Sequence, residues 1–481
     1  MPFEAVIGLE IHAQLQTASK IFCGCSTAFG APPNTHVCPV CLGLPGALPV
    51  LNRAAVDHAI RAALALGCRV NETSIFARKN YFYPDLPKGY QISQYEQPLA
   101  SRGTLDFDTA GGRRQVGITR VHLEEDAGKS LHEGFPDSDR RTYVDYNRSG
   151  TPLIEIVTEP DLRSAADAAE FFATLRTILV WLGVNDGNME EGSLRCDANV
   201  SVRPEGASAL GTKAEVKNLN SFRFVQRALE YEIGRQIELV EQGRRVVQET
   251  RLWDAAAGAT MSMRSKEEAH DYRYFPEPDL PPVVVDSQRI RGIEAAMPEL
   301  PDARRQRFIA VQGLPAYDAG QLTQSRAQAD FFEAAIGAGA PPKAASNWIR
   351  GELARALKAA GLEIARSPVA PEHLAGLLAL IEDRTISGAM AKGVFDTMFA
   401  TGAAAADIVR EEGLAQIDDA AQIAAVIADV LDRERDAVAQ YRAGKAATFG
   451  FLVGQVMRAA AGKANPKRVN ELLRSALEAR R

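Results

Sequence analysis

The stretch AVIGLEIHAQL, residues 5–15, carries the pattern from which the fold of the N-terminal half follows. Apolar residues occupy every second position, at Ala5, Ile7, Leu9, Ile11, Ala13 and Leu15. The positions between them include Glu10, His12 and Gln14. Alternation with a period of two is typical of a β-strand with one buried face and one polar face. We therefore expect a strand whose polar face carries a carboxylate, an imidazole and an amide.

Four further segments alternate in the same way: ITRVHLEED (118–126), TPLIEIVTE (151–159), GSLRCDANVSV (192–202) and TKAEVKN (212–218). The pattern favours neighbouring strands of a mostly antiparallel sheet, because such a sheet can bury one face and leave the other open. Charged and amide side chains on these segments are Glu124, Glu125, Glu155, Arg195, Asp197, Asn199, Lys213, Glu215 and Lys217. We expect these side chains to lie on the open face of the sheet.

Carboxylates together with arginine and lysine on one face suit a Mg²⁺ site that holds nucleotide phosphates. Oxygen ligands bind the ion, and cations neutralise the charge on a phosphoryl group in transfer. His12 follows Glu10 on the same face, and either a metal ligand or a structural histidine fits that position. For each strand taken separately, an ordinary solvated face remains the alternative. A glycine-rich phosphate loop is absent from the sequence, since Leu123 stands where the first glycine of a P-loop ending at 128–130 is required.

Four cysteines close to the start of the chain, Cys23, Cys25, Cys38 and Cys41, form a Cys-x-Cys and a Cys-x-x-Cys pair. Each pair can place two thiolates on one tetrahedral ion, so the spacing favours a structural Zn²⁺ site. Two disulfides are the rival interpretation, which requires an oxidising compartment. The first residues lack the features of a secretory signal, and no apolar run is long enough to cross a bilayer. We therefore expect zinc, a cytoplasmic location and no membrane partner. Cys68 and Cys196 lie in apolar stretches and are expected to be buried.

The composition and periodicity of the sequence change twice along the 481 residues. The first part contains short alternating segments, and the later part contains long stretches of Ala, Leu and charged residues with helical periodicity, such as 343–357. We expect an α+β domain over residues 1–293, a helical linker domain over 294–405 and a small helical tail domain over 406–481.

Basic residues concentrate in the tail. Nine Lys or Arg and two acidic residues between positions 441 and 481 give a local charge of +7 in a chain of net charge −6. The pattern indicates either a polyphosphate partner or a solvated basic helix.

A resemblance to a known family adds to these predictions. Seven segments spread from residue 7 to residue 466 closely resemble the B subunit of the bacterial aspartyl/glutamyl-tRNA amidotransferase: IGLEIHAQL, RKNYFYPDLPKGYQISQ, LEEDAGKS, DYNRSGTPLIEIVTEPD, EGSLRCDANVSVRP, EVKNLNSF and FLVGQVMRAAAGKANP. The resemblance implies that the first domain is a cradle related to the glutamine synthetase catalytic fold. It implies that a helical linker follows, and that the tail contacts tRNA through Lys463, Lys467 and Arg468.

The resemblance also implies the reaction: ATP-dependent phosphorylation of the side-chain carboxylate of Glu-tRNA(Gln) or Asp-tRNA(Asn), followed by amidation with ammonia. By resemblance, Glu10, His12, Glu125 and Glu215 surround Mg²⁺. Lys79, Arg195, Asp197, Asn199 and Lys217 contact ATP phosphates or the substrate carboxylate, and Glu124 and Glu155 are further catalytic candidates. A glutaminase, the A subunit of the complex, supplies the ammonia, and the heterotrimer also includes a small C subunit. Members of the family differ in whether they have the zinc cysteines, and this sequence has all four.

Two alternatives remain open on the sequence. One is an enzyme of the same chemistry that acts on a free small acid, against which the basic tail counts. The other is a zinc-bearing RNA-binding module without catalysis, against which the acidic sheet face counts.

Overall fold

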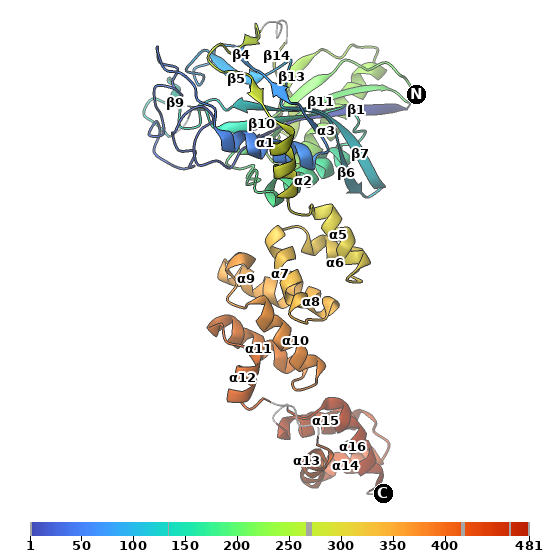
Figure 1. Cartoon of the computed structure of the whole chain (residues 1–481). Helices are drawn as coiled ribbons and strands as arrows, with labels where there is room; N and C mark the ends of the chain where they lie inside the picture. The colour runs from blue at the N-terminus through green and yellow to red at the C-terminus, as the bar shows by residue number, and fades with distance from the viewer. Residues whose placement is uncertain (1, 133, 266–271, 415–418, 461–462, 480–481) are drawn as a thin grey trace. The chain divides into compact units, whose positions relative to one another are not determined.

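The computed structural model describes residues 2–132, 134–265, 272–414, 419–460 and 463–479. The chain divides into two compact units, Met1–Leu300 and Pro301–Arg481. Over the described residues, the first unit contains the strands of the fold together with four α-helices, and the second is helical (Figure 1). The expected further division of the helical half near residue 405 stays a prediction.

A nine-stranded sheet forms the centre of the first unit, in the order β14-β13-β12-β11-β1-β10-β7-β6-β2. The strands β12 and β13 run parallel, and the other neighbouring pairs are antiparallel, so the sheet is mixed but mostly antiparallel as expected. In chain order the strands are β1 (Phe3–Gln14), β2 (Arg69–Val70), β6 (Ala100–Thr109), β7 (Gly112–Glu125), β10 (Pro152–Thr158), β11 (Leu194–Pro204), β12 (Ala214–Lys217), β13 (Glu249–Asp254) and β14 (Ala259–Ser265).

Three helices cover one face of this sheet: α1 (Arg53–Ala65), α2 (Ala165–Trp181) and α3 (Phe222–Glu241). Their N-termini are capped by the side chains of Asn52, Ser164 and Ser221, each of which accepts a backbone N–H. Their apolar residues join the apolar face of β1 in one core, in which Ile7 and Ile11 are fully buried. The opposite, polar face of the central strands is thereby left available for chemistry.

Shorter elements complete the first unit. A three-stranded sheet consists of β15 (Phe275–Pro276), β4 (Phe76–Asn80) and β5 (Tyr90–Gln94). Two strand pairs follow, β3 (Thr73–Ser74) with β16 (Val283–Val284) and β8 (Lys129–Leu131) with β9 (Tyr143–Asp145). Helix α4 (Ser287–Ala295) is the last element of the unit.

The second unit consists of helices over its described residues. They are α5 (Pro301–Ala310), α6 (Ala316–Leu322), α7 (Arg326–Gly337), α8 (Pro342–Trp348), α9 (Ala354–Ala360), α10 (Pro371–Glu382), α11 (Gly388–Thr401), α12 (Ala405–Glu411), α13 (Ala420–Arg433), α14 (Arg435–Arg442), α15 (Ala447–Ala459) and α16 (Pro466–Ala479), with a π-helical segment Ile349–Leu353 and a 3₁₀ turn Ile364–Arg366. The helix expected over 343–357 is present as α8, the π segment and α9 in continuous succession. The last four helices share a hydrophobic core of their own, in which Leu452, Val456 and Leu473 are fully buried.

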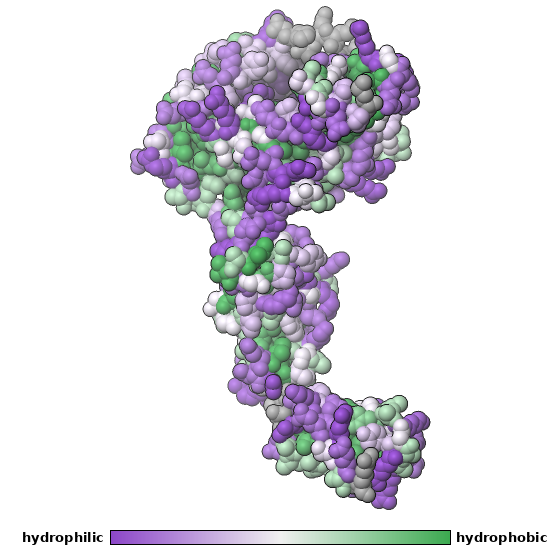
Figure 2. Space-filling view, turned by 90° about the vertical axis from the view of Figure 1, so that its right-hand side faces the viewer, coloured by the Kyte–Doolittle hydropathy of each residue, from purple (hydrophilic) through white to green (hydrophobic). Residues whose placement is uncertain are grey.

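The outer surface is mixed in polarity. In the space-filling view, hydrophilic side chains cover much of both units, and apolar side chains are interspersed among them (Figure 2). None of the described helices combines the length and the apolar character that a membrane span needs.

Candidate active site

Strand register brings the predicted polar residues into rows that run across four strands. His12 on β1 lies opposite Arg195 on β11 and opposite Glu155 on β10, and Glu155 in turn lies opposite His122 on β7. Two residues along, Glu10 lies opposite Asp197. Because residues two apart share a face, all these side chains project from the open side of the sheet.

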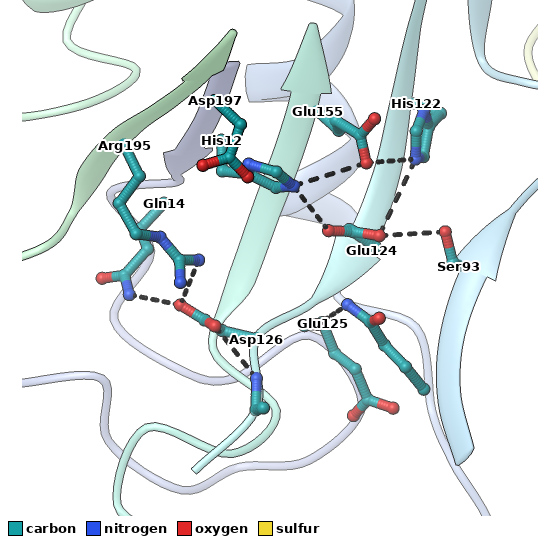
Figure 3. Close-up of polar contacts among 12 residues, drawn as sticks. His12, Gln14, Ser93, His122, Glu124, Glu125, Asp126, Glu155, Arg195 and Asp197 are labelled. Carbon is teal, nitrogen blue, oxygen red and sulfur yellow. Dashed lines mark hydrogen bonds and ion pairs between the residues drawn. The ribbon is translucent and has the colours of Figure 1, made fainter. Parts of the chain in front are cut away.

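The centre of the site is a cluster of two histidines and two carboxylates (Figure 3). His12 Nε2 lies 3.4 Å from Glu155 Oε2 and 3.7 Å from Glu124 Oε1. His122 Nε2 makes the matching contacts on the other side, 3.4 Å to Glu155 and 3.7 Å to Glu124. Ser93 on β5 donates a hydrogen bond to Glu124 Oε2 (3.0 Å). Ligand atoms of His12, Glu124 and Glu155 all lie within 4.8 Å of one another, so the three side chains can share one metal ion.

Charges within the cluster control its protonation. Burial alone would lower the pKa of His122, but the charges and hydrogen bonds of Glu155 and Glu124 outweigh it and raise the pKa to about 9. The pKa of His12 is raised for the same reason against the same opposing effect of burial. Burial would raise the pKa of Glu155, yet the two histidines hold it well below its usual value. The carboxylates therefore stay ionised, as a metal ligand must be.

A second group of contacts lies along β11 and β12. Lys217 Nζ donates to Asp197 (2.6 Å) and lies 3.1 Å from Glu215. Asn199 Nδ2 donates to Glu10 Oε1 (2.9 Å). Burial alone would lower the pKa of Lys217, but the charges of Asp197 and Glu215 raise it, so the side chain remains an ammonium ion.

Both groups face a cleft of about 1170 Å³. Residues of the cleft that were predicted from the sequence are Glu10, His12, Lys79, Glu155, Asp197, Asn199, Glu215 and Lys217. Tyrosines of the β4–β5 region and of residues 272–274 line its other wall, and Lys79 Nζ lies 5.0 Å from the ring centre of Tyr272. The charges of Glu124 and Glu155 raise the pKa of Lys79 although burial opposes this. A cation is thus held over the acidic cluster.

Glu125 lies elsewhere. Its side chain pairs with Lys88 and accepts a hydrogen bond from the backbone N–H of Ile92 (2.9 Å) in a separate pocket of about 150 Å³. In Figure 3 it points away from the histidine cluster. Glu124 and Glu125 are consecutive residues of a strand and point to opposite sides, so the structure places Glu125 apart from Glu10 and His12. That Glu125 joins Glu10, His12 and Glu215 around one ion stays a prediction.

The four cysteine thiols of the N-terminal loop converge. Their Sγ atoms lie within 4.8 Å of one another, and Cys38 and Cys41 are 3.9 Å apart. A Zn–S bond of ~2.3 Å separates the sulfurs of a tetrahedral site by ~3.8 Å. All four thiols are free of disulfides. The donor set therefore fits a zinc ion.

Several residues of these sites were missed in the sequence. Lys20 is fully buried beside the thiols, where Nζ donates to the carbonyl of His36 (2.7 Å) and contacts Cys41 Sγ (3.6 Å). The hydrogen bond from Cys23 and the charge of Lys20 are among the causes that lower the pKa of Cys41 to about 4. Asp126 accepts from Gln14 (2.7 Å) and from Arg195 (3.0 Å). The sequence carries a signal for His122 and Asp126, since both alternate with Glu124 and Asp126 belongs to the acidic end of segment 118–126, whereas Lys20 carries none. Cys68 and Cys196 are buried as expected.

The predicted tRNA-contacting residues lie at the start of α16. The backbone N–H groups of Lys467 and Arg468 are capped by Asn465 Oδ1, and both side chains are exposed. Lys463 precedes the helix and donates to the carbonyl of Gly413 (2.6 Å). Residues 461–462 of the tail motif lie outside the described residues.

The fold and the cleft define a domain that gathers carboxylate, imidazole and cationic side chains on the open face of a mixed sheet. A family model described as the GatB/GatE catalytic domain matches residues 5–291, and a second, described as the GatB domain, matches residues 330–477. Similar proteins from Geotalea daltonii (57% identical over 478 residues, 99% of this chain and 100% of the relative) and Geobacter sulfurreducens (56% over 478 residues, 99% and 100%) are both named as the B subunit of aspartyl/glutamyl-tRNA(Asn/Gln) amidotransferase. One from Myxococcus xanthus with the same name is 55% identical over 475 residues, which cover 99% of this chain and 98% of that protein.

The chain belongs to this family, that of the B subunits of aspartyl/glutamyl-tRNA(Asn/Gln) amidotransferases.

Proposed function

We propose that this chain performs the ATP-dependent part of tRNA-dependent amidation. The side-chain carboxylate of Glu-tRNA(Gln) or Asp-tRNA(Asn) attacks the γ-phosphorus of ATP, which gives an acyl phosphate and ADP. Ammonia then adds to the acyl carbon, phosphate leaves and a proton is released, which yields the amide of Gln-tRNA(Gln) or Asn-tRNA(Asn). The reaction needs the first step because a carboxylate has no usable leaving group.

One observation carries the proposal: the cleft of the family's catalytic domain combines an acidic cluster that fits a metal with a set of fixed cations. Phosphoryl transfer needs charge neutralisation and positioning, and little covalent work by the protein. In this proposal Lys79, Arg195 and Lys217 stabilise phosphoryl oxygens, and Asp197 and Asn199 position these cations and the substrate carboxylate. The relationship of the domain to the glutamine synthetase catalytic fold belongs to the same proposal and rests on the sequence resemblance.

Glu124 and Glu155 supply the oxygen ligands that Mg²⁺ prefers, His12 would join them through its neutral imidazole, and the ion would keep several waters. His12, Glu124 and Glu155 would hold the ion, which would neutralise phosphate charge when bound. Glu10 and Glu215 line the same cleft and hold Asn199 and Lys217 in place. His122 orients both carboxylates from the opposite side.

The remaining parts of the proposal concern cofactors and partners. Zn²⁺ at Cys23, Cys25, Cys38 and Cys41 stabilises the N-terminal loop. The ammonia comes from a glutaminase, the A subunit, which a small C subunit holds in a heterotrimer with this chain. Ammonia at neutral pH is mostly protonated, so delivery from a partner through a water-excluding path keeps it nucleophilic. The tail contacts the tRNA backbone through Lys463, Lys467 and Arg468. The complex works in the cytoplasm.

The test co-expresses the chain with candidate A and C subunits and supplies Glu-tRNA(Gln), ATP, Mg²⁺ and either glutamine or ammonium. Wild type should form Gln-tRNA with both nitrogen sources, and its ATP hydrolysis should depend on mischarged tRNA. Glu155→Gln should lose product with both sources, because it damages phosphorylation. Glu170→Gln, an exposed substitution on α2, is the matched control and should leave the rate unchanged.

Three outcomes would contradict the proposal. Rescue of Glu155→Gln by ammonium would assign that residue to ammonia delivery. ATP hydrolysis that depends on free glutamate would indicate an enzyme for a small acid, and no hydrolysis in the presence of the partner subunits would indicate a binding module.

A further inference from the structure

The loop that joins β9 to β10, residues 146–151, binds the N-terminal loop that carries the four cysteines, residues 23–41. Asn147 makes this contact with both ends of its side-chain amide. Its Oδ1 accepts a hydrogen bond from the backbone N–H of His36 (2.8 Å), and its Nδ2 donates to the carbonyl of Pro32 (2.8 Å). The β9–β10 loop thus satisfies backbone groups of a segment that lies outside the helices and strands.

Gly150 brings the same two loops into direct packing contact. Its φ of +82° lies in the left-handed region that favours glycine, and a Cβ there would lie 3.5 Å from both Cys41 Cβ and Lys20 Cδ. Ser149, the residue before it, donates from Oγ to the carbonyl of Cys41 (3.3 Å). Because the contact is this close, a displacement of one loop displaces the other.

The opposite side of the β9–β10 loop fixes Asp126, which directly follows β7. The backbone N–H of Gly150 donates to the carbonyl of Asp126 (2.9 Å), and the N–H of Asp126 donates to the carbonyl of Thr151 (2.8 Å). Arg148 Nε donates to the carbonyl of Ala127 (2.9 Å) and lies 3.8 Å from Asp126 Oδ1. Both the backbone and the side chain of Asp126 are therefore held by this loop.

Asp126 in turn holds the guanidinium of Arg195 (Figure 3). Its Oδ2 accepts from Arg195 (3.0 Å) and from the amide of Gln14 (2.7 Å), and Asp126 is 4% exposed. Strand register sets Arg195 opposite His12. The Nε of Arg195 is buried and makes no hydrogen bond within the part of the chain that the structure describes. The contact with Asp126 therefore sets the direction of this cation.

We propose that Asp126 and Asn147 are positioning residues for Arg195, so that the docking of the N-terminal loop holds this guanidinium in the orientation that the reaction uses. The inference rests on the proposed function, in which Arg195 stabilises phosphoryl oxygens, and adds how that cation is kept in place. An arginine side chain has many rotamers, whereas catalysis by fixed charges requires the charge to be in place before the transition state forms. A misplacement of about 1 Å lowers a rate by about 100-fold.

The experiment is a double-mutant cycle on the chain co-expressed with the candidate A and C subunits. Single-turnover formation of Gln-tRNA(Gln) from Glu-tRNA(Gln), ATP, Mg²⁺ and ammonium is measured for Asp126→Asn and for Asn147→Ala, each with Arg195 present and with Arg195→Ala. Zinc content and melting temperature are recorded for every variant. Asp139→Asn is the matched control, because its side chain is 75% exposed in the connection between β8 and β9.

We expect Asp126→Asn to lower the rate by about 10- to 100-fold, as the loss of a group that orients a functional side chain does. Asn147→Ala should lower it by about threefold or more and keep the zinc, because it loosens the loop from one side. With Arg195→Ala, either change should lower the rate by less than about twofold, because the group that they position is gone. Asp139→Asn should change the rate in neither background.

A purely structural role predicts a different result, since it lowers the melting temperature and reduces the rate by the same factor in both backgrounds. That result, or a wild-type rate for either Asp126→Asn or Asn147→Ala, would overturn the positioning role of the residue concerned. If Arg195→Ala forms product too slowly to measure, the same cycle is read from the dissociation constant of ATP, which needs no turnover.

Failure of the proposed function gives results of another kind. Full activity of Arg195→Ala would remove Arg195 from the reaction, and the absence of ATP-dependent product from wild type in the presence of its partners would refute the ATP-dependent function itself. Neither result can be mistaken for additivity in the cycle.

Discussion

At the scale of single residues, Glu124 and Glu125 have different surroundings although they are neighbours. Glu124 contacts two histidines and a serine on the cleft side. Glu125 is 1% exposed and pairs with Lys88, whose side chain is 7% exposed. Removing one partner of a buried ion pair leaves an uncompensated charge, so the two residues should respond differently to the same substitution.

Glu125→Gln should lower the free energy of unfolding by about 3 kcal/mol, because it strands the Lys88 ammonium in a buried pocket. It should leave the Mg²⁺ concentration for half-maximal amidation unchanged. Glu155→Gln should instead weaken Mg²⁺ activation by about 10- to 100-fold or more. Chemical denaturation and Mg²⁺ titrations of both variants check this pair of expectations. A shift in Mg²⁺ dependence caused by Glu125→Gln would contradict the separation of the two sites.

At the scale of elements, two parts of the first unit each depend on a few polar contacts. One is the N-terminal loop that carries the four clustered cysteines, and the other is the junction of α3 with β13 and β14. The loop docks through Asn34 and His36, whose backbone N–H groups donate to Asp145 (2.9 Å) and Asn147 (2.8 Å). This docking brings the thiols against the segment that leads into β10, where Glu155 resides. A loop held by four thiols and a few hydrogen bonds has little apolar core and should depend on its metal.

Substituting Cys38 and Cys41 together by serine should reduce the zinc content from about one ion per chain to near zero and lower the melting temperature, since a structural zinc site contributes folding free energy. Elemental analysis and thermal melts measure both effects. Cys68→Ala is the control, because it removes a cysteine outside the cluster and should keep the metal. Retention of one zinc per chain in the double variant would show that the site is wrongly assigned.

The junction of α3 with the sheet edge is held by Glu232, which is fully buried. Its carboxylate accepts from Arg235 (2.6 and 2.9 Å), from Thr260 on β14 (2.8 Å) and pairs with Arg251 on β13 (3.2 Å). Thr250, next to Arg251, donates to Glu215 in the cleft (2.8 Å). The helix therefore supports one edge of the site.

Glu232→Gln should destabilise the chain by about 3 kcal/mol, because Arg251 and Arg235 lose the negative charge that compensates their burial. Denaturant unfolding of the variant measures this. Glu238→Gln, exposed on the same helix, should change stability by less than about 0.5 kcal/mol. Equal effects of the two substitutions would show that the network contributes nothing specific.

At the scale of the whole molecule, the acidic clusters of the cleft and the basic run of the tail lie in different units. Acidic clusters and the cleft belong to the first unit, and the basic run belongs to the last helices of the second. Because α13–α16 have a hydrophobic core of their own, this part can be removed without opening the core of the first unit.

Deleting residues 408–481 should weaken tRNA binding and leave the first unit folded. Lys467→Ala with Arg468→Ala should weaken binding less and reduce the slope of log affinity against log salt by about 2, because each substitution removes one cation from a phosphate group. Fluorescence anisotropy with labelled tRNA at several salt concentrations measures both. If tRNA-dependent amidation survived the deletion unchanged, the tail would have another role.

The sequence by itself determined the features that depend on local pattern. Alternation along residues 5–15 predicts the central strand and the face on which Glu10 and His12 lie, because side-chain direction in a strand repeats every two residues. The spacing of Cys23, Cys25, Cys38 and Cys41 predicts their cluster, and the helical periodicity after residue 300 predicts the second unit. None of these requires knowledge of which segments pair.

The tertiary structure alone decided the features that depend on pairing between distant segments. Register across β11, β1, β10 and β7 placed Glu155 between His12 and His122, and loops far from each other in sequence enclosed Lys20. The position of Glu125 depends on both local pattern and long-range packing. Alternation along the strand separates it from Glu124, but only folding supplies Lys88 as its partner. Local patterns set the direction of a side chain, whereas its neighbours follow from long-range packing, which a single strand or helix does not encode.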